Sequence, residues 1–261
     1  VGSEMCIRDS YYVCYPMVRN KFKIYKMMER RRMYMANVGC RIRKEFERPD
    51  RKLIEAFKDI PVANIDDCMN RTAAVDSQLK PMNKARLLGT AFTVKAPAGD
   101  NLMFHKALDM AKPGDVLVIA TFGSQSRSLC GEIMTRYAMS KGLAGFVVDG
   151  CIRDSVEIGQ ITDFPVYAKG VTPNGPYKNG PGEINFPVSC GNQVICPGDI
   201  LVGDGDGLLV IKPEEAAELA ERAKKVSRDE TKQFAGIAAG TGLNRDWVDA
   251  KLESIGVEYV D

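Results

Sequence analysis

The chain has 261 residues, of which 45% are hydrophobic, and it carries a formal net charge of +2. This length and apolar content suffice to bury a large core, so we expect one compact domain rather than a fibrous or wholly disordered chain. No apolar run approaches the length of a membrane span, and the eight cysteines form no CxxC pair, which together favour a soluble, cytoplasmic protein with reduced thiols.

Charge is distributed unevenly along the chain. Residues 1–48 contain 12 Lys/Arg and 5 Asp/Glu, a net charge of +7, and the remainder has 24 against 29, or −5. The first 45 residues are also rich in methionine and lack clean periodicity, so we expect residues 1–45 to be disordered or foreign to the fold. A basic targeting or nucleic-acid arm is the alternative, but the run 30–32 is too short to be specific, and nucleic-acid binding is not expected.

The first well-marked element is a helix over residues 102–110. Asp100 or Asn101 can cap its start, because both side chains accept hydrogen bonds from free helical N–H groups. His105, the only histidine, lies on this helix. A single histidine excludes a multi-histidine zinc site, and it leaves open whether His105 belongs to a functional site or only to the helix surface.

A β-α-β unit follows. A turn at 112–115 introduces a strand over 115–120, apolar residues then recur at helical spacing from 129 to 138, and Lys141-Gly142 closes the helix. A second strand over 145–148 is β-branched and apolar, as in strands covered on both faces, and Asp149-Gly150 is expected to break it. Such units are right-handed with parallel strands, which predicts an α/β fold.

Three charged residues fall at the same edge of this unit. Glu132 lies near the helix start, and Arg153 and Asp154 follow the second strand, where parallel sheets gather their ligands. A carboxylate suits Mg²⁺, and the helix N-terminus and an arginine suit a small anion. A metal beside an arginine would stabilise the enolate of a 2-oxo acid, so this edge is the candidate site.

The C-terminal third contains a loop, a hairpin and helices. The Gly/Pro-rich segment 172–182 should lack helix and strand, and Asp-Gly pairs between 200–202 and 208–211 indicate a hairpin. A proline at its start, early acids and late bases predict a strong helix from 213 to 226 that continues to 234, before a glycine-rich break at 236–242. An amphipathic piece over 247–255 should pack on a neighbouring subunit.

From about residue 60 to 261 the chain resembles the RraA-like family, which contains class II 4-hydroxy-4-methyl-2-oxoglutarate / 4-carboxy-4-hydroxy-2-oxoadipate aldolases and regulators of ribonuclease E activity. The aldolase pattern is an acid, twenty residues, then Arg-Asp, and Glu132, Arg153 and Asp154 match it with glutamate in place of the usual aspartate. Other matching segments are 98–108, 112–118, 145–154, 187–191, 197–207 and 256–261. The resemblance implies a swivelling β/β/α domain over 46–226 with a helical arm over 227–261.

Roles for individual residues come with the resemblance. It implies that Asp154 binds Mg²⁺ or Mn²⁺, that Glu132 reaches the metal through water, and that Arg153 contacts the substrate carbonyl and carboxylate. The pyruvyl carboxylate would lie on the backbone of the helix start, with two further side chains lining the site. The residues concerned are Gly131, Glu132, Ile133 and Met134, then Asn101 and His105.

Further acids and an assembly are also implied. Asp67 matches an acid of the aldolase active site, and Glu230 matches a metal-site acid from the neighbouring subunit, with Asp229 as its rival. The family forms trimers or hexamers. The resemblance therefore implies a metal-dependent lyase that releases pyruvate from 4-hydroxy-2-oxo acids and decarboxylates oxaloacetate. A regulator that binds the ribonuclease E machinery is the alternative.

Overall fold

The computed structural model describes residues 37–260, and its compact unit begins at Gly39. Residues 40–42 form strand β1 (Cys40–Ile42), which pairs in parallel with β7 (Gly182–Ile184), and Arg41 Nε lies 2.5 Å from Glu183 Oε1. The expected boundary at residue 45 is therefore wrong, because a three-residue edge strand is too short to show periodicity. Residues 1–36 of this segment lie outside the part of the chain that the structure describes, so the expectation for them stays a prediction.

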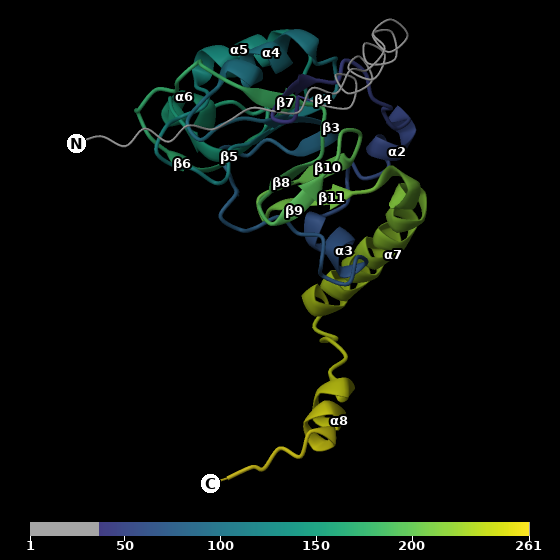
Figure 1. Cartoon of the computed structure of the whole chain (residues 1–261). Coiled ribbons are helices and arrows are strands. Elements are labelled where there is room, and N and C mark those ends of the chain that lie inside the picture. Colours follow the sequence, from purple (N-terminus) through teal and green to yellow (C-terminus); the bar gives the residue numbers. More distant parts are fainter. Residues whose placement is uncertain (1–36, 261) are drawn as a thin grey trace, which may run out of the picture. The chain divides into compact units, whose positions relative to one another are not determined.

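A mixed sheet forms the centre of this unit (Figure 1). Its strand order is β1-β7-β3-β4-β5-β6-β2, and the hairpin β10–β11 pairs with β3 beside this path. The middle strands are parallel and the edge strand β2 is antiparallel. Their bounds are β2 Lys80–Pro81, β3 Leu87–Lys95, β4 Asp115–Ala120, β5 Gly145–Ile152 and β6 Val166–Val171. The predicted α/β class and the parallel β-α-β unit are confirmed.

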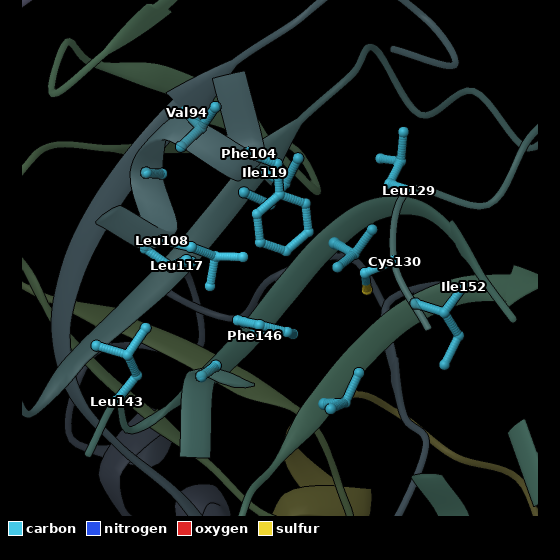
Figure 2. Close-up of a cluster of buried hydrophobic side chains, with 14 of the residues drawn as sticks. Val94, Phe104, Leu108, Leu117, Ile119, Leu129, Cys130, Leu143, Phe146 and Ile152 are labelled. Atoms are coloured by element: carbon cyan, nitrogen blue, oxygen red, sulfur yellow. The ribbon is translucent and has the colours of Figure 1, made fainter. Parts of the chain in front are cut away.

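Side chains alternate between two cores along the central strands. Leu117 and Ile119 of β4 face the helices α4 (Leu102–Met110), α5 (Glu132–Ser140) and α6 (Ser155–Gly159). Figure 2 shows this core, where Phe104 of α4 meets Phe146 of β5 edge to face at 5.0 Å. The intervening valines of β4 face β8 (Val188–Cys190) and β9 (Gln193–Ile195). Both faces of the sheet are thus buried, which explains the uninterrupted apolar strands.

A third core joins the hairpin to three further helices. The predicted hairpin is confirmed as β10 (Ile200–Gly203) and β11 (Leu208–Ile211), and its apolar residues pack on three helices. These are α2 (Arg51–Glu55), α3 (Val62–Asp67) and α7 (Pro213–Ala238). Helix α7 runs through Gly236, so the expected break starts later, at Gly240, which has a positive φ.

The last helix, α8 (Asp246–Ser254), buries none of its residues. Trp247 is 67% exposed and Ile255 62%. No apolar side chain of α8, nor that of its C-cap Ile255, is therefore buried by the described residues 37–260. Across residues 37–260, no helix combines the length and the apolar character needed to pass through a bilayer.

Two expectations around β5 need correction. The strand does not stop at Val148 but continues to Ile152, with a shift of register between Val148 and Cys151. Gly150 is needed there because a Cβ would lie 2.9 Å from the carbonyl oxygen of Ser124, so the glycine marks a close approach rather than a strand end. Helix α5 begins at Glu132 rather than 129, because Leu129 N–H and the Cys130 carbonyl instead bond to Cys151 and Arg153 at the end of β5. The 172–182 loop contains no helix, and only its last residue joins a strand, β7.

Candidate active site

The end of β5 holds the start of α5 in place. Leu129 N–H donates to the Cys151 carbonyl at 2.8 Å, and Arg153 N–H donates to the Cys130 carbonyl at 3.0 Å. The next contact uses a side chain, because the N–H of Glu132 donates to Asp154 Oδ2 at 2.9 Å. The structure therefore brings Asp154 to the N-terminus of α5, as the β-α-β unit predicts.

A pocket of about 320 Å³ opens at this junction. Its walls come from α4, the segment before α5, the end of β5 and the 172–182 loop. The lining residues are Asn101, His105, Ser128, Leu129, Cys130, Gly131, Ile133, Met134, Arg153, Asp154, Gly175, Pro176 and Lys178. Most residues predicted for substrate and metal binding thus share one cavity outside the carboxyl ends of the parallel strands.

A larger hollow of about 740 Å³ lies at the opposite end of β4. Several of its charged residues are already paired with one another: Arg48 binds Asp115 at 2.7 Å, and Arg51 binds Glu55 at 2.6 Å. Charges that neutralise each other offer little to a ligand, so we place the candidate site at the smaller pocket.

Arg153 and Asp154 lie side by side at the pocket mouth. Arg153 Nε is 3.7 Å from Asp154 Oδ2, and their side chains are 47% and 38% exposed. Asp154 adopts the left-handed conformation, with φ at 55°, which aspartate tolerates better than most residues. The guanidinium therefore remains open to solvent and to a ligand.

The donor set fits a cation with a single protein carboxylate. Among the described residues there is no group of three His, Cys, Asp or Glu side chains that could hold a metal. Mg²⁺, however, commonly takes one or two carboxylates and keeps several waters. The Glu132 N–H and Arg153 both contact Oδ2 of Asp154. The other carboxylate oxygen, Oδ1, takes part in neither contact.

Glu132 contributes its backbone rather than its carboxylate. Its Oε1 accepts a hydrogen bond from Arg136 Nε at 2.7 Å along the helix surface, and its side chain does not line the pocket. Its expected water-mediated contact with a metal would have to use Oε2 or break this ion pair.

Asn101 and His105 face the pocket from α4. Asn101 caps α4 with its backbone, and its side-chain Nδ2 donates to the Leu129 carbonyl at 2.8 Å. Burial and the positive charge of Lys178 lower the pKa of His105 from its ordinary value, although Asp109 acts in the opposite direction. The imidazole is therefore neutral at pH 7 and able to accept a proton.

Cys130 is the pocket's only thiol among the residues described. Burial, reinforced by nearby Asp154, raises the pKa of this thiol to about 12, although Arg153 acts to lower it. Because only the thiolate is a good nucleophile, Cys130 serves packing and not covalent catalysis.

Asp67 and Glu230 do not reach the pocket within one chain. Asp67 on α3 pairs with Arg71 at 2.9 Å, and Glu230 on α7 accepts from Asn64 Nδ2 at 2.7 Å. Asp229, the rival of Glu230, pairs with Lys232 at 2.9 Å. All three lie on α3 or α7, two helices that pack against each other (Figure 1), and none of them lines the pocket.

The 172–182 loop is the part of the site that sequence reasoning missed, and it supplies Lys178. Asp100, which is buried, fastens this loop by accepting from the N–H groups of Asn179 and Gly180 at 2.5 and 3.0 Å. Arg127 stacks 3.9 Å from the Tyr177 ring centre and donates to the Gly175 carbonyl at 2.6 Å. The loop directly follows strand β6 at the ligand-binding edge of the sheet, and this position could have indicated that it lines the site.

The substitution Gly131→Ala tests the crowding at the helix start. A Cβ at Gly131 would collide with Asp154 Oδ2 and would lie 2.9 Å from Arg153 Cγ. The backbone there suits any residue, with φ at −151°, so the fold should survive while both side chains move. We expect about a tenfold or larger loss of kcat/KM for a reaction carried out in this pocket, the size of effect typical of displaced supporting groups. An unchanged kcat/KM with an unchanged melting temperature would contradict this geometry.

Known proteins are similar to this chain in sequence and in fold. The family model for RraA-like proteins, described as Aldolase/RraA, matches residues 62–210. A protein of Halalkalibacterium halodurans named "Putative 4-hydroxy-4-methyl-2-oxoglutarate aldolase" is 39% identical over 200 residues, which covers 76% of this chain and 95% of that protein.

Solved structures of RraA proteins are also similar to this chain. RraAS2 of Streptomyces coelicolor, described as an unusual member of the RNase ES inhibitor RraA family, is 26% identical, with a TM-score of 0.62 over 73% of this chain and 98% of that one. The RNA-processing inhibitor RraA from Thermus is 30% identical, with a TM-score of 0.54 over 59% and 93%.

Proposed function

Because the chain belongs to the RraA-like family, we propose that it is a divalent-metal-dependent aldolase that cleaves 4-hydroxy-2-oxo acids, such as 4-hydroxy-4-methyl-2-oxoglutarate, to pyruvate and a second oxo acid. The observation that carries this proposal is the placement of Arg153 and Asp154 against the N-terminus of α5 in one pocket. A relative named as an aldolase supports the same reaction class.

The start of α5 would bind the substrate carboxylate. The N–H groups of Ile133 and Met134 precede the first intrahelical hydrogen bond, which Thr135 N–H makes to the Gly131 carbonyl at 3.1 Å. Such N–H groups and the positive end of the helix dipole favour an anion. The guanidinium of Arg153 adds a planar pair of donors to the 2-oxo group and the carboxylate.

Cleavage then breaks the C3–C4 bond of the substrate. The 4-hydroxyl loses its proton, C4 becomes a carbonyl, and the bonding electrons pass to the pyruvyl half as an enolate that is reprotonated at C3. Bound Mg²⁺ or Mn²⁺, held by Asp154, would supply Lewis acidity at the 2-oxo group. Arg153 stabilises the negative charge that develops there. Oxaloacetate decarboxylation would use the same enolate, with CO₂ as the other product.

His105 is proposed to take the hydroxyl proton, and this has a consequence for pH dependence. Because its pKa is lowered, activity should fall on the acid side with a midpoint below the ordinary histidine value of about 6.5, as the imidazole protonates. We expect His105→Gln to lower kcat about 10²-fold and to abolish this acid limb.

The pH profile of Lys178→Met checks the electrostatic cause. Loss of the lysine charge should raise the pKa of His105 and shift the acid limb towards higher pH. An acid limb that stays in place in both variants would remove His105 from the reaction.

A coupled pyruvate-release assay tests the proposal itself. A panel of 4-hydroxy-2-oxo acids and oxaloacetate, each with Mg²⁺ or Mn²⁺ and with chelator, should give pyruvate above the protein-free rate only when metal is present. Failure to release pyruvate across the panel would count against the enzyme and favour inhibition of RNA processing, the activity named for the Thermus relative.

We further propose that copies of this chain assemble through the C-terminal arm as trimers or hexamers, which the unburied apolar residues of α8 support. Deleting residues 240–261 should lower the oligomeric mass in light scattering, because the apolar face of α8 is removed. The cut spares α7 and the Glu230–Asn64 hydrogen bond. An unchanged mass would exclude the arm as the contact between copies.

A further inference from the structure

Asp100 is a buried carboxylate that bonds to two walls of the pocket at once. It is 3% exposed, and its Oδ1 accepts from the Leu102 N–H at 2.9 Å, in the first turn of α4. Its Oδ2 accepts from two consecutive N–H groups of the 172–182 loop, at 2.5 and 3.0 Å. One side chain therefore ties the start of α4 to a loop that lies 79 and 80 residues further along the chain.

The helix alone does not require a charged group in this place. A helix cap needs one side-chain acceptor, and serine or asparagine supplies it without burying a charge. A buried charge is costly unless hydrogen bonds compensate for it, and here the two bonds from the loop add to the single bond from the helix. The carboxylate of Asp100 thus serves the loop more than the cap.

The loop residue that depends on this carboxylate is Lys178. Before it, Tyr177 is held independently, because its N–H donates to the Gly99 carbonyl at 2.8 Å and its ring stacks on Arg127. After it come the two residues whose N–H groups bond to Asp100. Removing the carboxylate therefore releases one of the two anchors on either side of Lys178.

Lys178 and His105 approach the pocket from the two elements that Asp100 joins, and both line it. Burial, and after it the positive charge of Lys178, lower the pKa of His105, whereas Asp109 raises it. Asp109 lies on α4 itself, where Lys106 pairs with it at 3.8 Å. The other charged side chains of the pocket wall are Arg153 and Asp154.

We propose that Asp100 is a positioning residue that holds the Lys178 ammonium beside the His105 imidazole by joining the elements that carry them. The consequence for catalysis rests on the proposed function, in which His105 takes the hydroxyl proton. A lysine held close disfavours a second positive charge on the imidazole, which keeps it free to accept that proton. A released lysine would let His105 protonate at higher pH.

Proton NMR of the untagged protein measures this directly, because His105 is the only histidine. In Asp100→Ala the titration midpoint of His105 should move to higher pH as Lys178 is released. Loss of a nearby carboxylate would by itself move the midpoint to lower pH, so the sign separates the two causes. Asp109→Ala is the matched control: it removes the same charge from the other end of α4, and the midpoint should move to lower pH.

A second substitution shows whether Asp100 acts through Lys178. Lys178→Met alone should raise the midpoint, and adding Asp100→Ala should then raise it no further. A rise that persists in the Lys178→Met background would mean that Asp100 only keeps water out of the pocket, and it would overturn the inference. A fall or no change in Asp100→Ala would overturn it as well.

The unaltered protein provides a measurement that stands even if Asp100→Ala does not fold. Amide hydrogen exchange should be slow at Asn179 and Gly180, which bond to Asp100, and fast at the exposed neighbour Lys178. Equal exchange at the three amides would show that the loop is not fastened.

Activity distinguishes this inference from the proposed function. If Asp100→Ala folds, its kcat/KM for pyruvate release should fall by about 10²-fold, as for other small displacements in an active site, and its acid limb should move to higher pH with the midpoint of His105. An acid limb that stays in place while the midpoint moves would overturn the catalytic consequence. No pyruvate from the unaltered protein would instead defeat the proposed function, and the NMR and exchange results would still decide the role of Asp100.

Discussion

Replacing Asp154 by asparagine should lower kcat for pyruvate release by about 10³-fold, the upper range for loss of one electrostatic group in an active site. An asparagine Oδ1 can still accept from the Glu132 N–H, so the contact that holds α5 is preserved while the negative charge is lost. The apparent affinity for Mg²⁺ or Mn²⁺ should fall with it. Metal titration of the rate, together with the melting temperature, measures both effects.

Glu157→Gln is the matched control for this change. Glu157 lies one turn further along α6, is exposed and does not line the pocket, so its loss removes the same charge from the same helix. We expect its rate and metal dependence to be unchanged. A metal titration of Asp154→Asn that resembles the unaltered protein would rule out Asp154 as the cation ligand.

Arg153→Lys should reduce kcat by about 10²–10³-fold although the positive charge is retained. Lysine is a compact point charge, and it cannot donate two parallel hydrogen bonds to the carboxylate and the 2-oxo group. The loss should appear mainly in kcat, because the interaction strengthens as charge develops on the enolate.

Arg136→Lys provides the comparison. Arg136 is an exposed arginine on α5 whose partner is the carboxylate of Glu132, so its replacement should leave kcat within about twofold, as for most exposed ion pairs. If Arg153→Lys behaves like Arg136→Lys, the guanidinium of Arg153 does not contact the reacting group.

The sequence predicted the fold correctly wherever the apolar pattern and the residues that end an element indicate the same helix or strand. The strand over 115–120, the helix over 102–110 and the 200–211 hairpin follow from an apolar run after a turn, from capping and from Asp-Gly pairs, and the structure has all three. The prediction that Gly150 ends the strand was wrong, because a glycine can either end a strand or permit a close approach between two segments. Only the neighbouring chain, here the Ser124 carbonyl, distinguishes the two.

The sequence predicted where the backbone of the site lies, but it did not predict where the side chains point. Spacing along the β-α-β unit predicts that Glu132 and Asp154 meet, and they do, through a backbone N–H. The direction of the Glu132 carboxylate depends on Arg136, one helical turn away, a local competitor that spacing does not reveal. Lys178 was missed because its loop carries no periodic pattern, and its place in the wall depends on the distant Asp100.

We propose that this pocket forms the enolate of pyruvate with the help of a metal held at Asp154. Proton NMR of pyruvate in D₂O tests it without knowledge of the second half of the substrate, because enolate formation exchanges the methyl protons for deuterium. With Mg²⁺ the protein should accelerate this exchange, and chelator or Asp154→Asn should return it to the rate measured without protein under the same conditions. A folded, metal-supplied protein that leaves the exchange at the rate of free pyruvate would contradict the claim.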